Sequence, residues 1–542
     1  MILYLKSSVK LKFALLLILL SGISTSSFAI TRYVTPSGSG NLDGTSWINS
    51  NRGDSLQSVI NSSNVGDEVW VAAGTYRTTT GINRTISFSM RNGVAIYGSF
   101  SGNETLLSQR ITTNGLTSIL SAEIGIPGIA DNSYHTIQNT GLNNTAVIDG
   151  FIIRDANDNR VATTTNGLGG GIYNNGSGAG NVCSPTIRNC VIVDNQAVFG
   201  AGIFNSGYLG GVSNPLIINC VIAFNTATSG GGGMDNFALS GTASPTITNC
   251  VFYFNTAIQR AGAMYCWGGN NGNANPVVLN TAFVNNTAAD GGAIVSDRLN
   301  SGGGSSGNSN PSFSNCVFWG NTVSGTGPQF LILGGATFSA TYTDINLTGQ
   351  NPPHTISGAT TGNLNANPLF TNISLGAGVD NSWLSNDDGL QLQNSSPCIN
   401  AGSNSGVPLT DILNNNRINN STVDMGAYEY TPINSVLLNI KMYIQGFYTG
   451  PGSLLAVAEP ITNPNLCDTI TVELHDTLAP YGLAHTVTNT IDINGNGQFV
   501  FPPSVLNQSF YIAIKHRNCI ETWSKNPLLF NNVVKSFDFS AP

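Results

Sequence analysis

The chain has 542 residues, of which 63 are Gly and only 9% are charged, and its 20 basic against 28 acidic residues give a formal net charge of −8. Globular proteins average ~7% Gly and ~25% charged residues, so this composition excludes coiled coils, helical solenoids and basic nucleic-acid-binding proteins. Because 41% of the residues are apolar, the chain can bury a large core, unlike a disordered one.

Residues 1–29 are predicted to be an export signal. Lys6, Lys10 and Lys12 precede the apolar run Phe13–Leu20, and Ser27-Phe28-Ala29 gives a small-x-small cleavage pattern. The run is shorter than the ~20 residues that cross a bilayer, which disfavours a membrane anchor. Cleavage near Ala29 removes three Lys and leaves 17 basic against 28 acidic residues, a balance of −11. We expect an extracellular or cell-surface protein, handled by secretion or anchoring machinery, that binds no nucleic acid.

Residues 30–140 are predicted to form an N-terminal cap and the first coils of a β-helix. The segments are Tyr33–Pro36, Asp43–Trp47, Gly66–Tyr76 and Ile96–Glu104. They resemble the first coils of secreted right-handed β-helix proteins, and the resemblance implies a cap over the open end of the core.

Residues 141–330 contain a repeat with a period near 30. Its first element is a Pro followed by a short β-branched run, and it begins at Pro185, Pro215, Pro245, Pro276 and Pro311. Each copy contains Cys or Thr at one position and ends at an Asn, namely Asn195, Asn225, Asn255, Asn286 and Asn321. A second, Gly-rich element recurs as Gly170–Ile172, Ala201–Ile203, Gly232–Met234, Gly262–Met264 and Gly292–Ile294.

A fixed period of short runs punctuated by Gly and Asn is typical of a β-solenoid. We expect two or three parallel strands per coil, with inward side chains stacked on their equivalents in the next coil. Two such stacks are predicted, Ile187 with Ile217, Ile247, Val278 and Phe313, and Cys190 with Cys220, Cys250, Thr281 and Cys316. The Cys are interpreted as small buried groups, with disulfides or metal as the alternatives. The recurrent Asn are expected to adopt αL at the turns and to bond the next coil through their amides.

The repeats resemble those of polymorphic outer-membrane proteins, whose marks are a Gly-Gly-Ala-Ile element and a Phe-x-x-Asn element. Gly291–Ile294 matches the first mark, and Phe252–Asn255, Phe283–Asn286 and Phe318–Asn321 match the second. The resemblance implies a right-handed parallel β-helix of the pectate-lyase-like kind, exposed at the surface, with adhesion the commonest role in that family.

Residues 331–430 are predicted to contain the last coils and a C-terminal cap. Ser396–Gly402, Asn416-Arg417 and Val423–Glu429 resemble the end of the choice-of-anchor Q domain. That resemblance implies attachment to the cell surface, by an anchor that the sequence does not show.

Residues 431–542 have longer runs of alternating apolar and polar residues and are predicted to form a small antiparallel β-sandwich. Asn439–Tyr448, Cys467–Asp476 and Lys515–Trp523 resemble a C-terminal module of bacterial secreted surface proteins. Cys467 and Cys519 are the one pair considered for a disulfide. The stretch Asp492–Gly497 resembles the start of an EF-hand loop, but position twelve is Pro503 rather than Glu, so a hairpin turn is favoured over calcium.

The β-helix contains no Lys between Lys12 and Lys441, which excludes a polysaccharide lyase with a Lys base in this region. A lyase or hydrolase that uses Arg and carboxylates remains the alternative function. Its candidates are Arg154, Arg188, Arg260 and Arg298, with Asp194, Asp235, Asp290 and Asp297.

The leading hypothesis is non-catalytic adhesion or glycan binding, to an extracellular polysaccharide or to the surface of a host or neighbouring cell. Its candidate ligand-binding residues follow the Gly-rich element and are Tyr173, Phe204, Asp235 and Tyr265. If the preceding Ile and Met point inward, these side chains form an outward column; burial under the inserts between coils is the alternative. No catalytic residue, metal site or cofactor is assigned, and a passive spacer is the third possibility.

Overall fold

The computed structural model describes residues 29–163, 166–298, 307–350, 356, 360–432, 435–458 and 460–540. The predicted export signal lies outside them except for Ala29. The chain divides into two compact units, Met1–Tyr430 and Thr431–Pro542. No helix in these described ranges is long and apolar enough to cross a membrane.

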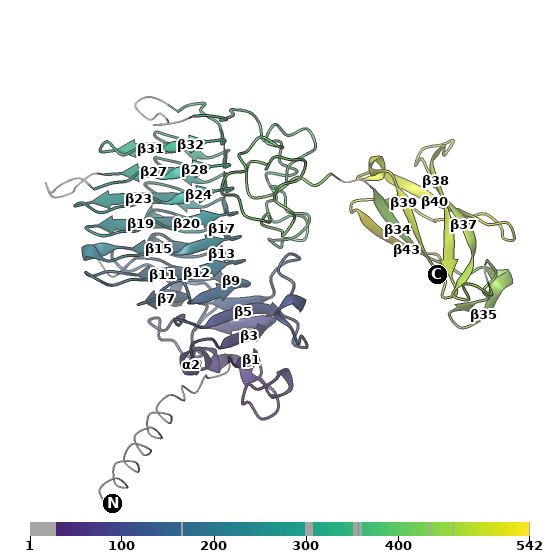
Figure 1. Ribbon diagram of the computed structural model, residues 1–542, viewed down its shortest axis with the longest axis horizontal. Helices are drawn as coiled ribbons and strands as arrows, with labels where there is room; N and C mark the ends of the chain where they lie inside the picture. The colour runs from purple at the N-terminus through teal and green to yellow at the C-terminus, as the bar shows by residue number, and fades with distance from the viewer. Residues whose placement is uncertain are drawn as a thin grey trace, which may run out of the picture. The chain divides into compact units, whose positions relative to one another are not determined.

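The first unit is a right-handed parallel β-helix built from four parallel sheets (Figure 1). We name the sheets A, B, C and D in the order in which one coil passes through them. Sheet A contains β2 (Asn51–Arg52), β1 (Thr31–Thr35), β3 (Glu68–Ala72), β5 (Ala95–Phe100), β8 (Val147–Asp149), β12 (Thr186–Arg188), β16 (Leu216–Ile218), β20 (Thr246–Thr248), β24 (Val277–Leu279), β28 (Ser312–Ser314) and β32 (Ser339–Thr341).

Sheet B contains β4 (Gly74–Arg77), β6 (Ser118–Ser121), β9 (Phe151–Arg154), β13 (Val191–Val193), β17 (Val221–Ala223), β21 (Val251–Tyr253), β25 (Ala282–Val284), β29 (Val317–Trp319) and β33 (Asp344–Ile345). Sheet C contains β10 (Asn157–Asp158), β14 (Gln196–Phe199), β18 (Thr226–Gly230), β22 (Thr256–Ala257), β26 (Thr287–Ala288) and β30 (Thr322–Val323). Sheet D contains β7 (Ile137–Thr140), β11 (Ile172–Asn175), β15 (Ile203–Ser206), β19 (Met234–Leu239), β23 (Met264–Gly269), β27 (Ile294–Asp297) and β31 (Phe330–Leu333).

Each regular coil therefore has four strands, for example β12 to β15, rather than the two or three expected. The short strands of sheet C were missed because a run such as Thr256–Ala257 shows no periodicity. Both predicted inward stacks are confirmed. Ile187, Ile217, Ile247, Val278 and Phe313 pair in register and are buried in one core, and the Cys column beside them is also fully buried.

The Cys of this column are free thiols, and Cys220, Cys250 and Cys316 also approach a carbonyl of the preceding coil at 3.6–3.7 Å. The Sγ atoms of Cys190, Cys220, Cys250 and Cys316 each donate to the carbonyl two residues earlier at 3.2 Å. The Oγ1 of Thr281 makes the same bond at 3.0 Å. The interpretation of these positions as small buried groups is confirmed.

The recurrent Asn residues form a hydrogen-bonded ladder inside the turn between sheets B and C. The Nδ2 of Asn195, Asn225, Asn255 and Asn286 each donates at 3.0 Å to the Oδ1 of the ladder Asn of the next coil. Amide bonding between coils is thus confirmed, but the αL conformation belongs to the preceding residue, such as Asp194 with φ 57° or Phe224 with φ 54°. The expectation of αL is therefore wrong for the ladder Asn. It holds for the Asn that precedes each Cys or Thr of the repeat, namely Asn189, Asn219, Asn249, Asn280 and Asn315, with φ between 48° and 54°.

The Gly-rich element has two separate backbone requirements. Gly200 and Gly231 have φ values of 58° and 66°, where an L side chain is strained. At Gly202 a Cβ atom would lie 2.4 Å from the carbonyl oxygen of Gly233 in the next coil. Gly is therefore needed once for the turn and once for the close approach of two coils.

The N-terminal end of the core is covered by α2 (Leu56–Ser62), whose Leu56, Val59 and Ile60 are buried in it. At the other end Phe330 stacks on Phe338 with ring centroids 4.0 Å apart. Short 3₁₀ turns complete the elements, at η1 (Trp47–Asn49), η2 (Gly53–Ser55), η3 (Leu107–Gln109), η4 (Ile129–Asp131), η5 (Tyr208–Gly210), η6 (Gln445–Phe447) and η7 (Pro503–Val505).

Residues 360–430, which we call the cover segment, leave the coils after Leu364, which still pairs in parallel with Asp344 of β33. They run back along the outer face of sheet B, where Figure 1 shows them as green chain without strands beside β13 and β17. Leu384 accepts a backbone hydrogen bond from Gly115, and Trp383 packs on Tyr253. The C-terminal cap predicted within residues 331–430 is thus mainly a lateral cover on one sheet.

The second unit is one curled sheet with the order β41 (Thr522–Trp523), β40 (Ser509–Lys515), β37 (Leu466–His475), β38 (Leu483–Asp492), β39 (Asn496–Phe501), β34 (Val436–Lys441) and β43 (Val534–Asp538), with β42 (Leu528–Leu529) beside β40 and a small pair β35 (Tyr448–Gly450) and β36 (Ser453–Leu454). Its pairings are antiparallel except that of β34 with β43. Residues from β34 and β40 share one core, so a single sheet folds over on itself instead of forming two separate layers.

Two smaller expectations for this unit have clear outcomes. Cys467 and Cys519 are both free thiols, so the disulfide is not formed. The segment after Asp492 is the turn between β38 and β39, and the Oδ1 of Asp492 accepts the backbone N–H groups of Asn494 and Asn496 at 2.9 and 2.8 Å. The predicted hairpin is confirmed.

We expect Asn225→Ala to lower the free energy of unfolding by about 2–5 kcal/mol, because it breaks the ladder in its middle. The change removes the donor to Ile192 O at 3.0 Å and the acceptor for the backbone N–H of Asn195 at 3.1 Å, all buried. Urea unfolding measures the effect, with the exposed Asn394→Ala as the matched control. Equal stability of the two variants would contradict a stabilising ladder.

Candidate functional site

The predicted ligand-binding column exists but is not exposed. Tyr173, Phe204, Asp235 and Tyr265 follow one another in register on the outer face of sheet D. Their exposed fractions are only 1%, 2%, 2% and 7%, because the turns from sheet C pack over them through Leu168, Phe199 and Ala261. The expectation of an open aromatic face is therefore wrong.

Asp235 differs from the rest of this column because it is a buried carboxyl among aromatic side chains. Burial raises the pKa of its carboxyl far above the ordinary value, and its Oδ1 has no hydrogen-bond partner among the residues that the structure describes. A buried polar group without a partner costs about 1–3 kcal/mol. Asp235 therefore destabilises the column in which it lies.

We expect Asp235→Val to raise the thermal unfolding midpoint, because a β-branched apolar residue fits a strand between Phe204 and Tyr265 and removes the desolvated carboxyl. Differential scanning calorimetry at pH 7 measures the change. Thr228→Ala, at an exposed position of β18, is the control. A midpoint equal to or below that of the wild type would show that Asp235 has a partner that stabilises it.

The candidate Arg residues lie in four different settings. Arg188 pairs with Asp149, and Arg260 lies 3.4 Å from Asp297, which also accepts the hydroxyl of Tyr265 at 2.8 Å. Arg298 donates to two backbone carbonyls, and Asp290 accepts from Thr326. These pairs hold turns and strands together. Arg154 differs, because it borders a groove.

The groove lies on sheet B where the cover segment leaves the outer face incompletely covered. It has a volume of about 460 Å³. Ile152, Val191 and Val193 form its floor, and Arg154, Asp194 and Phe224 line its edge on the β-helix side. The cover segment contributes the opposite wall, residues 374–378 and 381–383 with Trp383.

At one edge of the groove, two carboxylates converge on one guanidinium. The Nε of Arg154 lies 2.9 Å from Asp155 Oδ1, and its Nη2 lies 3.3 Å from Asp194 Oδ2. Burial raises the pKa of Asp194 above its ordinary value; the charge of Arg154 opposes the rise and that of Asp155 adds to it. The Arg154 and Asp194 side chains remain 40% and 47% exposed, so they can meet a ligand.

Beside the charges, the same corner carries exposed aromatic rings. The αL position before each ladder Asn is occupied in successive coils by Asp194, Phe224, Phe254, Asn285 and Gly320, and we call this row the corner column. Phe224 and Phe254 stack with centroids 5.9 Å apart at 13° and are 44% and 41% exposed. A bulky residue at positive φ is uncommon and strained, which points to a use for these rings beyond folding.

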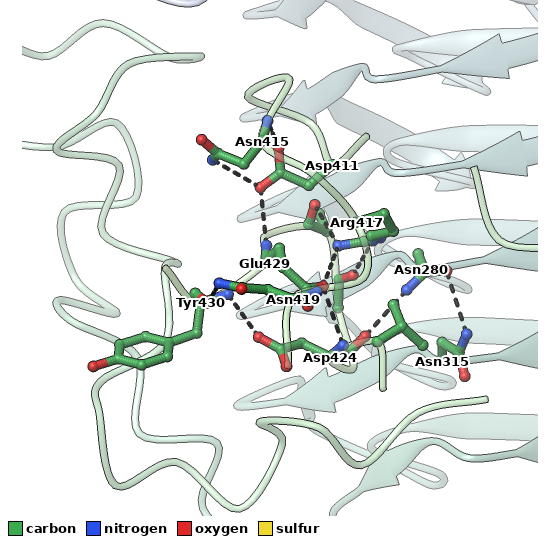
Figure 2. A network of polar contacts seen from close by, with 12 residues as sticks. Asn280, Asn315, Asp411, Asn415, Arg417, Asn419, Asp424, Glu429 and Tyr430 are labelled. Carbon is green, nitrogen blue, oxygen red and sulfur yellow. Dashed lines mark hydrogen bonds and ion pairs between the residues drawn. The ribbon is translucent and has the colours of Figure 1, made fainter. Parts of the chain in front are cut away.

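The cover segment is fixed to the β-helix by a buried polar network (Figure 2). Arg417 is fully buried, donates to Asn249 Oδ1 at 2.9 Å and lies 3.7 Å from Glu429. Asp424 and Asp411 lie around it, and Asn280 donates to the carbonyl of Asp424 at 3.1 Å. The network joins residues 411–429 to the coils. The far wall of the groove is held separately, because the Tyr253 hydroxyl donates to the carbonyl of Ile373 at 2.9 Å and accepts the backbone N–H of Gly376 at 3.1 Å.

Asp388 is a second buried carboxyl of the cover segment. Tyr428 donates to its Oδ2 at 2.8 Å, and its Oδ1 has no hydrogen-bond partner within the described part of the chain. Burial raises the pKa of Asp388 from 3.8 to about 7. Because the folded pKa lies above the unfolded one, the folded state holds the proton more tightly, and this stabilisation is lost as the pH rises through about 7.

We therefore expect stability to fall by roughly 4 kcal/mol at most between pH 4 and pH 8 through this one group. Asp388→Asn should flatten that part of the profile, since an amide stays neutral. The neighbouring Asp387, whose pKa is lowered mainly by its hydrogen bond to Ser385 against the effect of burial, provides the control Asp387→Asn. Urea unfolding at several pH values measures both variants, and equal slopes for them would contradict the assignment.

One side of the groove could have been identified from the sequence, and the other could not. The corner column can be read as the residue before each repeating Asn, which places two Phe beside Asp194. Trp383 and its neighbours carry no repeat, and they meet Tyr253 across 130 positions of sequence. Only the fold brings them together.

No protein-family model and no curated protein matches the chain. Among solved structures it is similar to pectate lyase Pel9A, with a TM-score of 0.35 and 15% identity over 76% of this chain and 98% of that one. It is also similar to a 1,3-α-1,4-β-D-galactose-4-sulfate-3,6-anhydro-D-galactose-2-sulfate 4 galactohydrolase, with a TM-score of 0.25 and 12% identity over 54% of this chain and 71% of that one. The chemistry of the groove rests on its own residues.

Proposed function

We propose that this is an exported protein whose sheet-B groove binds an extracellular polysaccharide chain. The observation that carries the proposal is the exposed Phe224 and Phe254 stack beside the Arg154–Asp194 pair at the groove edge. A sugar ring offers an apolar face of C–H groups and a rim of hydroxyls. Aromatic rings accept the first, and charged or amide side chains bond the second.

Three features of the groove suit a chain rather than a small molecule. Its edge extends over successive coils, because the corner column carries Asp194, Phe224 and Phe254 one after another. Its floor is apolar and its edges are polar. Its walls are held by parallel strands on one side and by the contacts of Tyr253 with Ile373, Gly376 and Trp383 on the other, so little ordering is needed on binding.

A second candidate function is cleavage of the bound chain, and the convergence of Asp155 and Asp194 on Arg154 favours it. A carboxyl with a raised pKa can act as a general acid. Protonated Asp194 would give its proton to the glycosidic oxygen as the C1–O bond breaks. Water would attack C1 and lose its proton to Asp155.

The binding proposal predicts that Phe224→Ala with Phe254→Ala weakens polysaccharide affinity about tenfold or more. The measurement is retardation of the full chain in native gels that contain xylan, mannan, laminarin or polygalacturonate. Ile258→Ala, at a residue 62% exposed on a neighbouring turn, is the control and should bind as the wild type does. Unchanged retardation of the double variant, or no retardation of the wild type by any of the polymers, would overturn the proposal.

The same polymers separate binding from cleavage. Release of reducing ends without unsaturated product by the wild type, lost in Asp194→Asn while gel retardation is kept, would establish a hydrolase. Retardation without product would establish a binding protein. Unsaturated uronate product would point to elimination, with a base other than Lys in the β-helix.

A further inference from the structure

The second unit carries an aromatic platform on the outer face of its sheet. In β40 the side chains of Ile512 and Ile514 enter the core, so Ala513 between them faces outward. Ala513 is nevertheless fully buried, and its neighbour across the β40–β41 pairing is Trp523. The indole therefore lies over the small residue on the sheet surface, with 38% of Trp523 exposed.

The indole is held in a defined orientation. Its Nε1 donates to Glu521 Oε1 at 2.6 Å, and its ring lies 4.4 Å from that of His475. His475 is itself fixed, since Nε2 lies 3.0 Å from Glu473 Oε2 and Nδ1 lies 2.9 Å from the carbonyl of Tyr481. A ring fixed along one face leaves the other face ready for contact without further ordering.

Polar groups border this platform on one side. Lys515 Nζ lies 2.8 Å from Glu473 and 3.7 Å from Glu521. The exposed members are Lys515 at 45% and Glu521 at 43% of their side chains. Two carboxylates and one ammonium give a local charge of −1, which disfavours an anionic ligand.

The row of rings continues past the indole. The ring centroids of Tyr511 and Trp523 are 6.4 Å apart. Those of Tyr481 and Tyr511 are 5.7 Å apart, with an angle of 88° between the ring planes. Tyr481 is 47% exposed and belongs to the turn between β37 and β38. Trp523 and Tyr481 are exposed and the partly buried Tyr511 lies between them, so the row presents two exposed rings to a ligand.

We propose that this platform, made of Trp523, Tyr511 and Tyr481 with Glu521 and Lys515 at its edge, is a second carbohydrate site that binds neutral glycan chains. Sugar rings stack on the open indole and tyrosine faces, and their hydroxyls bond Glu521 and Lys515. The site belongs to the second unit alone, so it does not depend on the sheet-B groove.

The test uses the full chain carrying Phe224→Ala and Phe254→Ala, so that the groove contributes least. Native gels contain neutral xylan, mannan or laminarin, with polygalacturonate as the anionic comparison. Adding Trp523→Ala or Tyr481→Ala should each weaken retardation by a neutral polymer about tenfold or more. Tyr448→Ala, at an equally exposed Tyr of the same unit, should leave it unchanged.

The outcomes are distinguishable because Tyr481 lies in a turn outside the core. Near-ultraviolet circular dichroism reports whether Trp523→Ala still folds. If it does not fold, loss of retardation in Tyr481→Ala still supports the site. Retention in Tyr481→Ala would then overturn it and leave Trp523 as a structural residue. Retardation by no neutral polymer, by polygalacturonate alone, or equally in the folded Trp523→Ala variant would also overturn it.

Discussion

In the β-helix every inward side chain lies on its own counterpart one strand spacing, ~4.8 Å, away. A charge at such a position would meet its own kind in the next coil, and a mismatched size would open a gap. Amide groups are the exception, since each Asn of the ladder is donor to one neighbour and acceptor from the other. This constraint explains the shortage of charged residues, the repeated Cys and the Asn ladder that links successive coils. Side chains that could bind a ligand or carry a charge therefore lie at the corners, in the turns and on the outer faces of the sheets.

The sequence was sufficient where the stacking constraint acts directly. Ile187 and Cys190 with their equivalents were identifiable as core because identical spacing places them in one column. The number of strands was not identifiable, because two residues such as Thr256–Ala257 cannot show a period. The direction of a side chain could be predicted, but its exposure could not. Tyr265 does point away from the main core, and Ala261 of a neighbouring turn still covers it.

The two carbohydrate sites proposed for this chain follow one physical pattern in unrelated settings. Phe224 lies at a corner of the parallel coils, at a strained positive φ. Trp523 lies on the outer face of a sheet, across from the small Ala513. In both, the ring is fixed by the fold and charged groups lie at its side. The β-helix site also needs the cover segment, and the buried Asp388 accepts the backbone N–H of Leu384 next to the wall residue Trp383, so it influences the groove without lining it.

The corner column has a meaning for how such a protein can change. Each coil adds one residue to it, here Asp194, Phe224, Phe254, Asn285 and Gly320 in turn, and these side chains lie outside the stacked interior. A substitution there alters what the surface presents while the Asn ladder beneath keeps the coils in register. Substitutions in the corner column, one coil at a time, can thus change which polymer the surface binds while the architecture of the repeat stays the same.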